Sequence, residues 1–221
     1  MAEAWYFRRI AMSHHDKELE SGVFIGNQVD KSQLKNPIGR RLVEGFDRAA
    51  LSALDSIQPK NLHEAGCGEG RLTRMIAERY GIEVLATDFS NAIIDENSAA
   101  NRNSKIQYEQ ASVYELNPES HKRDTVVCCE VLEHLEEPRQ GLRALRALEA
   151  RAYLFSVPHE PIWRVLNMAR GKYWADWGNT PGHLNHWSAR SFAEILKGEG
   201  FAVERSLNPF PWLMAVATPV D

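Results

Sequence analysis

The chain has 221 residues, of which 43% are hydrophobic and 25% are charged, and its formal net charge at neutral pH is −4. This size and composition are typical of one globular domain with a substantial core. The acidic balance excludes a general attraction to nucleic acid or to an anionic membrane surface. No apolar run approaches the ~20 residues that a membrane-spanning helix needs.

The first part of the chain is polar and irregular. We expect residues 1–37 to form an N-terminal lead or lid, because they contain Gly26-Asn27 and Asp30-Lys31 but no periodic apolar pattern. Charged residues in this stretch argue against a signal peptide. The three cysteines, at positions 67, 128 and 129, fit neither a disulfide framework nor a zinc site. These features predict a protein of the reducing cytoplasm.

From residue 38 onward, strands and helices alternate in one predicted domain, 38–221. Helices are predicted at 38–57, 70–80, 90–100, 138–150 and 189–198, and strands at 60–65, 82–87, 105–110, 124–129, 152–157, 201–208 and 212–218. This alternation predicts an α/β fold, a doubly wound parallel sheet covered on both faces. The last two strands, joined by Asn208-Pro-Phe-Pro211, are typical of an antiparallel hairpin.

A glycine-dense turn, Gly66-Cys67-Gly68-Glu69-Gly70, lies between the first strand of this series and the next helix. Glycines permit backbone angles and close approach that a side chain would block. The loop delivers a ligand to the positive end of a helix. Asp88, at the end of the next strand, can accept hydrogen bonds from ribose hydroxyls. The pattern therefore predicts a ligand that carries a nucleoside.

The residues around the turn narrow the choice of nucleoside. No Lys-Ser/Thr pair follows, which excludes a Walker-type phosphate loop, and a dinucleotide fingerprint would read G-x-G-x-x-G. Glu64 would repel a pyrophosphate and suits a cationic ligand. With the later segment Glu130-Val-Leu-Glu-His-Leu135, the chain resembles the class I S-adenosylmethionine-dependent methyltransferases over residues 38–218. That family's first motif is an acid followed by G-x-G-x-G.

The resemblance implies a Rossmann-like sheet of strand order 3-2-1-4-5-7-6, with S-adenosylmethionine as methyl donor and S-adenosylhomocysteine as product. It implies that Glu64, Gly66, Cys67, Gly68 and Gly70 hold the amino-acid end of the cofactor, Asp88 the ribose and Phe89 the adenine. Ser112 and Val113 stand where many relatives carry an acid for the adenine amino group. Cys129 and Glu130 would lie beside the sulfonium.

Two arrangements remain open for removing a proton from a hydroxyl acceptor. The first is a histidine base, since an imidazole with a pKa near 6.5 accepts a proton at neutral pH. His134, His159, His183 and His186 fall in segments expected at the open edge of the sheet. We favour His183, which follows a Pro-Gly turn.

The second arrangement is a divalent metal. Glu130, Glu133 and His134 share a face if their segment begins a helical turn, and His183 or His186 would complete the set. This resembles the metal site of the small-RNA 3′-terminal 2′-O-methyltransferases and of ubiquinone-pathway O-methyltransferases. A mixed oxygen and nitrogen set suits Mg, Mn or Zn. In many methyltransferases, however, the same segment only caps a turn, so both arrangements stay open.

Residues 158–187 are rich in tryptophan and include Trp163 and Trp187, and relatives build a substrate cap there. The sequence thus predicts methyl transfer to a small-molecule acceptor, with oxygen favoured. The alternatives are a metal-dependent RNA 2′-O-methyltransferase, against which the acidic charge counts, and a non-catalytic cofactor-binding subunit. The acceptor and the oligomeric state, a homodimer included, stay open.

Overall fold

The computed structural model describes residues 19–20, 23–24, 37–169, 177, 180 and 182–220. Most of the predicted lid, 1–37, and part of the predicted cap therefore lie outside the described residues. Within the lid, two short strands, β1 (Leu19–Glu20) and β2 (Val23–Phe24), pair in antiparallel fashion.

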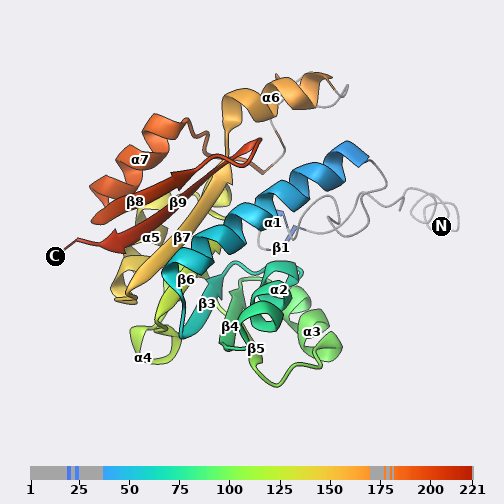
Figure 1. Cartoon of the computed structure of the whole chain (residues 1–221), viewed down its shortest axis with the longest axis vertical. Helices are drawn as coiled ribbons and strands as arrows, with labels where there is room; N and C mark the ends of the chain where they lie inside the picture. The colour runs from blue at the N-terminus through green and yellow to red at the C-terminus, as the bar shows by residue number, and fades with distance from the viewer. Residues whose placement is uncertain are drawn as a thin grey trace, which may run out of the picture.

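The predicted alternation of strands and helices is present from residue 37 onward (Figure 1). The helices are α1 (Pro37–Ile57), α2 (Arg71–Tyr80), α3 (Asn91–Ala100), α4 (Pro118–His121), α5 (Pro138–Ala147), α6 (Glu160–Ala169) and α7 (Ala189–Gly198). The strands are β3 (Asn61–Ala65), β4 (Glu83–Asp88), β5 (Ile106–Gln110), β6 (Thr125–Cys129), β7 (Ala152–Pro158), β8 (Phe201–Leu207) and β9 (Trp212–Pro219). Two short 3₁₀ turns, η2 (Val113–Glu115) and η3 (Leu132–His134), follow β5 and β6.

The seven strands form one sheet of order β5-β4-β3-β6-β7-β9-β8. Counted from β3, this is the expected order 3-2-1-4-5-7-6. The strands β3 to β7 run parallel, and β9 pairs antiparallel with both β7 and β8. The order reverses between β3 and β6, and ligands of open α/β sheets bind at the carboxyl ends of the strands on either side of such a point.

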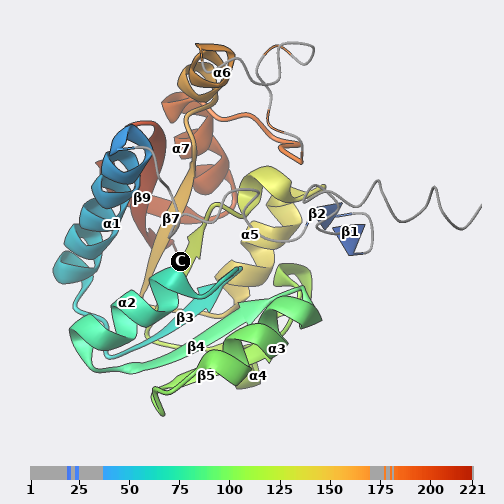
Figure 2. The same cartoon turned by 90° about the vertical axis from the view of Figure 1, so that its right-hand side faces the viewer.

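Helices cover both faces of the sheet, with α1 on one side and α5 and α7 on the other (Figure 2). Neighbouring residues of β6 show the division, because Val126 packs into the core beneath α5 and α7 and Val127 into the core beneath α1 and α2. A strand that is buried on both faces needs a continuous apolar run, which explains the sequence Thr125-Val-Val-Cys-Cys129.

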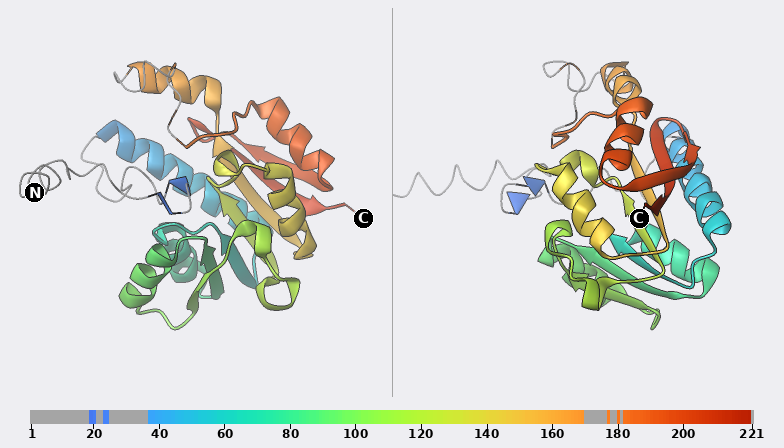
Figure 3. Two further views of the ribbon diagram at one scale, coloured as in Figure 1. Left: turned by 180° about the vertical axis from the view of Figure 1, so that it is seen from behind. Right: turned by 90° about the vertical axis from the view of Figure 1, so that its left-hand side faces the viewer.

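Several details differ from the sequence-based expectations, among them the short helix α4, which was not predicted. The predicted cap contains the helix α6, which continues the chain beyond the carboxyl end of β7 (Figure 3). The helix predicted at 138–150 is α5, which ends at Ala147 because Glu149 adopts a left-handed φ of 50°. The turn η3 begins only at Leu132, so Glu130 precedes it. Among the described residues, no helix is long and apolar enough to cross a membrane.

Candidate functional site

The glycine turn leaves β3 and enters α2 at the carboxyl edge of the sheet. Gly66 and Gly70 have φ values of 77° and 66°, in the left-handed region that glycine adopts without strain. The amides of Gly66 and Cys67 donate to the carbonyl of Thr87 at 2.8 and 2.9 Å, which ties the turn to the end of β4. The turn therefore has a fixed conformation.

Asp88 supports the same turn through its side chain. Its two carboxylate oxygens accept hydrogen bonds from the amides of Gly68 (2.9 Å) and Ser90 (3.0 Å). Asn97 of α3 donates to the Gly68 carbonyl at 2.7 Å, a contact that the sequence analysis missed. The residue expected to hold a ribose thus also links the glycine turn to the start of α3.

Glu64 is buried beneath the turn, at 3% exposure. Burial raises the pKa of this carboxyl to about 7, while the Thr73 hydroxyl, which donates to it, and nearby Arg71 act in the opposite direction. A cation bound beside Glu64 would stabilise the ionised carboxylate. The site is therefore suited to a ligand with a positive group at this end.

A cavity of about 540 Å³ opens beside the turn. It is lined by most of the residues predicted to bind a cofactor: Glu64, Gly66, Cys67, Gly68, Asp88, Phe89, Ser112, Val113, Cys129 and Glu130. Gly70 is not among the lining residues and instead caps the start of α2. The Ser112 hydroxyl accepts from the Tyr114 amide at 3.3 Å and so caps η2.

The cavity also has lining residues that the sequence analysis did not assign, including Phe46, Arg71, Gln110 and Tyr114. Phe46 lies on α1 and is buried. Arg71 is the first residue of α2, and its Nη1 lies 2.7 Å from both carboxylate oxygens of Asp47 on α1. It places a guanidinium at the cavity wall, where an anionic group of a ligand could bind.

Glu130 stands apart from the other acids of its segment. Its φ is 60°, and its carboxylate accepts hydrogen bonds from Trp212 Nε1 (2.6 Å) and Ser156 Oγ (3.2 Å). This backbone turn directs Glu130 to the cavity beside the glycine turn and away from the shared helical face that the metal prediction assumed. Trp212 in turn packs between Phe46 and Trp163, with ring centroids 5.3 and 5.5 Å away.

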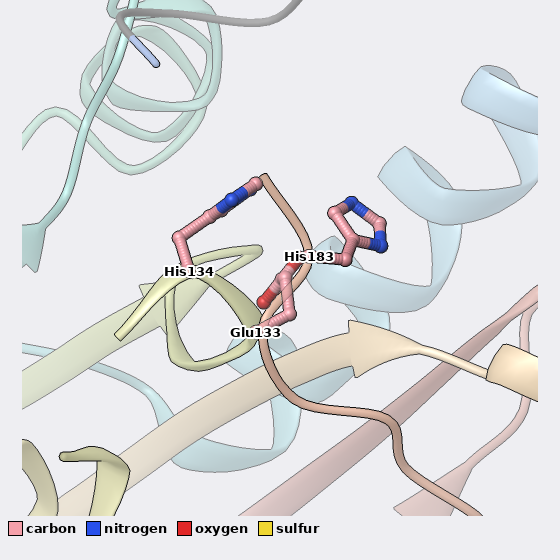
Figure 4. Close-up of side chains that lie close together, drawn as sticks. All are labelled: Glu133, His134 and His183. Atoms are coloured by element: carbon pink, nitrogen blue, oxygen red, sulfur yellow. The ribbon is translucent and has the colours of Figure 1, made fainter. Parts of the chain in front are cut away.

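Glu133, His134 and His183 form a compact cluster next to the cavity (Figure 4). One potential ligand atom from each lies within 4.8 Å of the other two, and His134 also lines the cofactor cavity. His134 Nδ1 lies 2.9 Å from the Gly182 carbonyl oxygen, and His183 Nδ1 lies 2.7 Å from Glu160 Oε1. A carboxylate and two imidazoles fit a divalent cation such as Mn²⁺ or Zn²⁺.

The other two predicted histidines lie elsewhere. His186 is exposed and lines a second cavity beside Trp187 and α6. His159 forms an isolated bridge with Trp187, and its amide donates to the Pro211 carbonyl at 3.0 Å. Neither is among the described residues that line the cofactor cavity. Of the four histidines, the structure brings only His134 and His183 together.

The strand order, the glycine turn at the point where it reverses and the spaced acid on β4 together define an S-adenosylmethionine-binding methyltransferase fold. A profile of the methyltransferase domain matches residues 36–206. The chain therefore belongs to the family of class I S-adenosylmethionine-dependent methyltransferases.

Known proteins agree with this assignment. A ubiquinone biosynthesis O-methyltransferase of Coxiella burnetii is 28% identical over 95 residues, which are 42% of this chain and 40% of that protein. The magnesium protoporphyrin IX methyltransferase of Synechocystis, solved with bound S-adenosylhomocysteine, superimposes with a TM-score of 0.63 at 20% identity, over 83% of this chain and 88% of the other. A bacterial Hen1 methyltransferase domain superimposes with a TM-score of 0.64 at 19% identity, over 80% of this chain and 99% of the other.

The sequence relative and the two solved structures support different conclusions. The match to the curated relative spans about two fifths of that protein's length. The two structures share the fold at low sequence identity. The family assignment itself rests on the domain profile over residues 36–206.

Proposed function

We propose that this protein transfers the methyl group of S-adenosylmethionine to an oxygen atom of a small-molecule acceptor. The observation that carries the proposal is the Glu133–His134–His183 cluster beside the cofactor cavity. A hydroxyl must lose its proton to become a good nucleophile, whereas a neutral amine already carries a reactive lone pair. A cluster of proton acceptors beside the cavity, with His134 on its wall, suits an oxygen acceptor.

Different residues of the cavity would bind different parts of the cofactor. Glu64 and the glycine turn receive its amino-acid end, where the carboxylate of Glu64 meets the positive amino group and Arg71 the negative carboxylate. Asp88 receives the ribose, and Phe89, Ser112 and Val113 receive the adenine. Cys129 and Glu130, which line the cavity at the end of β6, would lie toward the sulfonium. The bound cofactor supplies a methyl group on a positively charged sulfur.

The Glu133–His134–His183 cluster would activate the hydroxyl of the acceptor. His134, which lines the cavity, can accept the proton of a hydroxyl that approaches from there, and the His183 ring lies beside it at a centroid distance of 5.1 Å. The same three side chains fit a divalent cation, which would lower the pKa of a hydroxyl bound to it. In both cases, the side chains hold the acceptor oxygen in line with the methyl group, which aligns the reacting atoms and excludes water.

A metal titration tests the role of the cluster. Chelator-treated protein is titrated with S-adenosylhomocysteine and then with Mn²⁺, for the wild type and for Glu133→Gln and His183→Asn. We expect S-adenosylhomocysteine to bind all three proteins, and Mn²⁺ to bind the wild type at least tenfold more tightly than either variant. The control is His186→Asn, which lies outside the cluster and should bind Mn²⁺ like the wild type. Equal Mn²⁺ binding by all four proteins would leave the histidine base as the mechanism.

An acceptor comparison tests the element that is methylated. The protein is incubated with S-adenosylmethionine and either a dihydroxybenzoate or the corresponding diaminobenzoate, and mass spectrometry records the added methyl group. The proposal predicts methylation of the phenol; methylation of the amine alone would overturn it. A short RNA with a free 3′-terminal ribose is the third substrate. Methylation of that RNA, bound with strong salt dependence, would favour the RNA methyltransferase that the acidic charge argues against.

A further inference from the structure

His183 is paired with an acid that the proposed mechanism does not use. Glu160 is the first residue of α6, directly after β7, and its Oε1 lies 2.7 Å from His183 Nδ1. Both side chains are buried, Glu160 at 2% exposure and His183 at 8%. A buried carboxylate requires a specific partner, and this pair links α6 to the segment that carries His183.

The chemistry of the pair decides where the proton of the ring lies. A carboxylate oxygen accepts hydrogen bonds, so a neutral His183 ring in this contact donates from Nδ1 and carries its lone pair on Nε2. The neighbouring ring follows the same rule, because His134 Nδ1 faces the Gly182 carbonyl oxygen, which also only accepts. The two rings, whose centroids are 5.1 Å apart, thus leave Nε2 as the basic or metal-binding atom.

The backbone around His183 is already fixed to the other half of the cluster. The amides of Leu184 and Asn185 donate to the Glu133 carbonyl at 2.8 and 3.1 Å. The Asn185 side chain donates to the carbonyls of Leu132 and Leu135 at 3.2 and 2.6 Å. The main chain next to His183 is thus held at η3. The His183 ring can still rotate and change its tautomer, and the ring is the part of His183 that Glu160 contacts.

We propose that Glu160 is a positioning residue, which holds His183 in the tautomer with the proton on Nδ1 and turns Nε2 toward Glu133 and His134. The inference rests on the proposed function in one respect, namely that the cluster is where the acceptor hydroxyl is activated. Carboxylates that orient a histidine in this way are common behind metal-binding and general-base imidazoles. Glu160 acts only through His183.

The tautomer can be measured directly, without metal, cofactor or acceptor. Long-range ¹H–¹⁵N spectra of protein labelled at the histidine side chains distinguish the two neutral tautomers, and His183→Asn identifies the His183 signals. The chain contains a matched control, the pair of His121 and Glu109. There Nδ1 accepts from the Asn117 amide (2.7 Å) and Nε2 faces Glu109 Oε1 (3.1 Å), so His121 should show the opposite tautomer.

We expect His183 of the wild type to carry its proton on Nδ1, and Glu160→Ala to replace this with a mixture of tautomers. Glu109→Gln should alter the His121 signals and leave those of His183 unchanged. Mn²⁺ affinity should fall about ten- to a hundredfold in Glu160→Ala, with S-adenosylhomocysteine affinity unchanged. If Glu160→Ala does not fold, Glu160→Gln carries the test, because its amide can also donate to Nδ1 and so admits the other tautomer.

A single Nδ1-protonated tautomer that persists in both Glu160 variants would overturn the inference. So would a wild-type protein in which His183 carries its proton on Nε2. If the wild type fails to bind Mn²⁺ while the spectra behave as expected, the metal-binding part of the proposed function fails and the role of Glu160 stands. The two failures are therefore distinguishable.

Discussion

Arg71 and Asp47 join the two helices that flank the cofactor cavity, with Arg71 Nη1 2.7 Å from both carboxylate oxygens of Asp47. Arg71 opens α2, and Asp47 lies one residue after Phe46, which lines the same cavity. The pair is partly buried, so the position of the guanidinium is set by α1 as well as by α2. The long first helix therefore contributes to the wall of this cavity.

The first prediction concerns this arginine. Arg71→Met should weaken S-adenosylhomocysteine binding about ten- to a hundredfold, because a charge-assisted hydrogen bond to the ligand carboxylate is lost. Calorimetric titration measures the change. The matched control is Arg79→Met, since Arg79 pairs with Asp55 across the same two helices but does not line the cavity. Equal losses in the two variants would mean that the pair acts only through helix packing.

Patterns along the chain predicted the fold and most of the residues that line the cavity beside the glycine turn. The glycine turn and Asp88 are local signals, because each comes directly after a strand whose apolar pattern is visible in the sequence. Parallel strands end at one edge, so such residues meet without knowledge of the tertiary structure. The strand order was confirmed, but it came from the family resemblance and not from periodicity.

Contacts between distant segments could not be predicted in this way. One hydrogen-bond partner of Glu130 is Trp212, 82 residues further along the chain. The left-handed backbone turn at Glu130 could not be predicted either, because no glycine marks it in the sequence. Glu160 and His183 belong to different parts of the predicted cap. One signal was available, since a buried acid at the start of a helix that follows a strand is a candidate for a partner at the sheet edge.

The second prediction concerns the pH dependence of cofactor binding. Because burial raises the pKa of Glu64 to about 7, the carboxyl is largely protonated at pH 6 and largely ionised at pH 8. A ligand amino group binds the ionised form better, so affinity for S-adenosylhomocysteine should rise about tenfold from pH 6 to pH 8. Titrations at pH 6, 7 and 8 measure this rise, and buffers of different ionisation enthalpy should report a proton released on binding below pH 7.

Glu64→Gln should bind more weakly at pH 8 and with little dependence on pH. Glu69→Gln is the control of equal charge, because Glu69 lines the same cavity but is exposed. It should keep the wild-type pH profile. A flat profile for the wild type would show that Glu64 does not receive the amino group.

The third prediction concerns the pH dependence of folding stability, to which His63 and Glu64 contribute with opposite signs. His63 is fully buried beside His121, and burial, followed by the charges of His121 and Arg123, lowers its pKa to about 3. Between pH 6.5 and 3 the unfolded state binds a proton at this histidine that the folded state does not, so stability falls as the pH falls. From pH 7.5 to 5.0 this amounts to about 2 kcal/mol.

Urea unfolding at both pH values, for the wild type and for His63→Gln, measures the contribution as a difference, in which the other groups cancel. The carboxyl of Glu64 works in the other direction, since a raised pKa adds stability as the pH falls from 7 toward 4.5. The two contributions partly cancel, so the total pH dependence of wild-type stability is smaller than the contribution of either group. Parallel pH profiles for the wild type and His63→Gln would contradict the prediction.

The fourth prediction concerns the glycine turn itself. Gly66→Ala should weaken S-adenosylhomocysteine binding at least tenfold, because a Cβ there would overlap Val131 Cγ2 and the φ of 77° costs a non-glycine residue about 1–2 kcal/mol. Adding Val131→Ala removes the overlap and leaves the backbone strain, so the double variant should recover binding only in part. Gly45→Ala is the control: nothing lies within 4 Å of its Cβ, and alanine inside α1 should stabilise the fold by about 0.5–1 kcal/mol. Wild-type affinity in Gly66→Ala would show that the turn rearranges without cost, and that its fixed conformation is not what binds the cofactor.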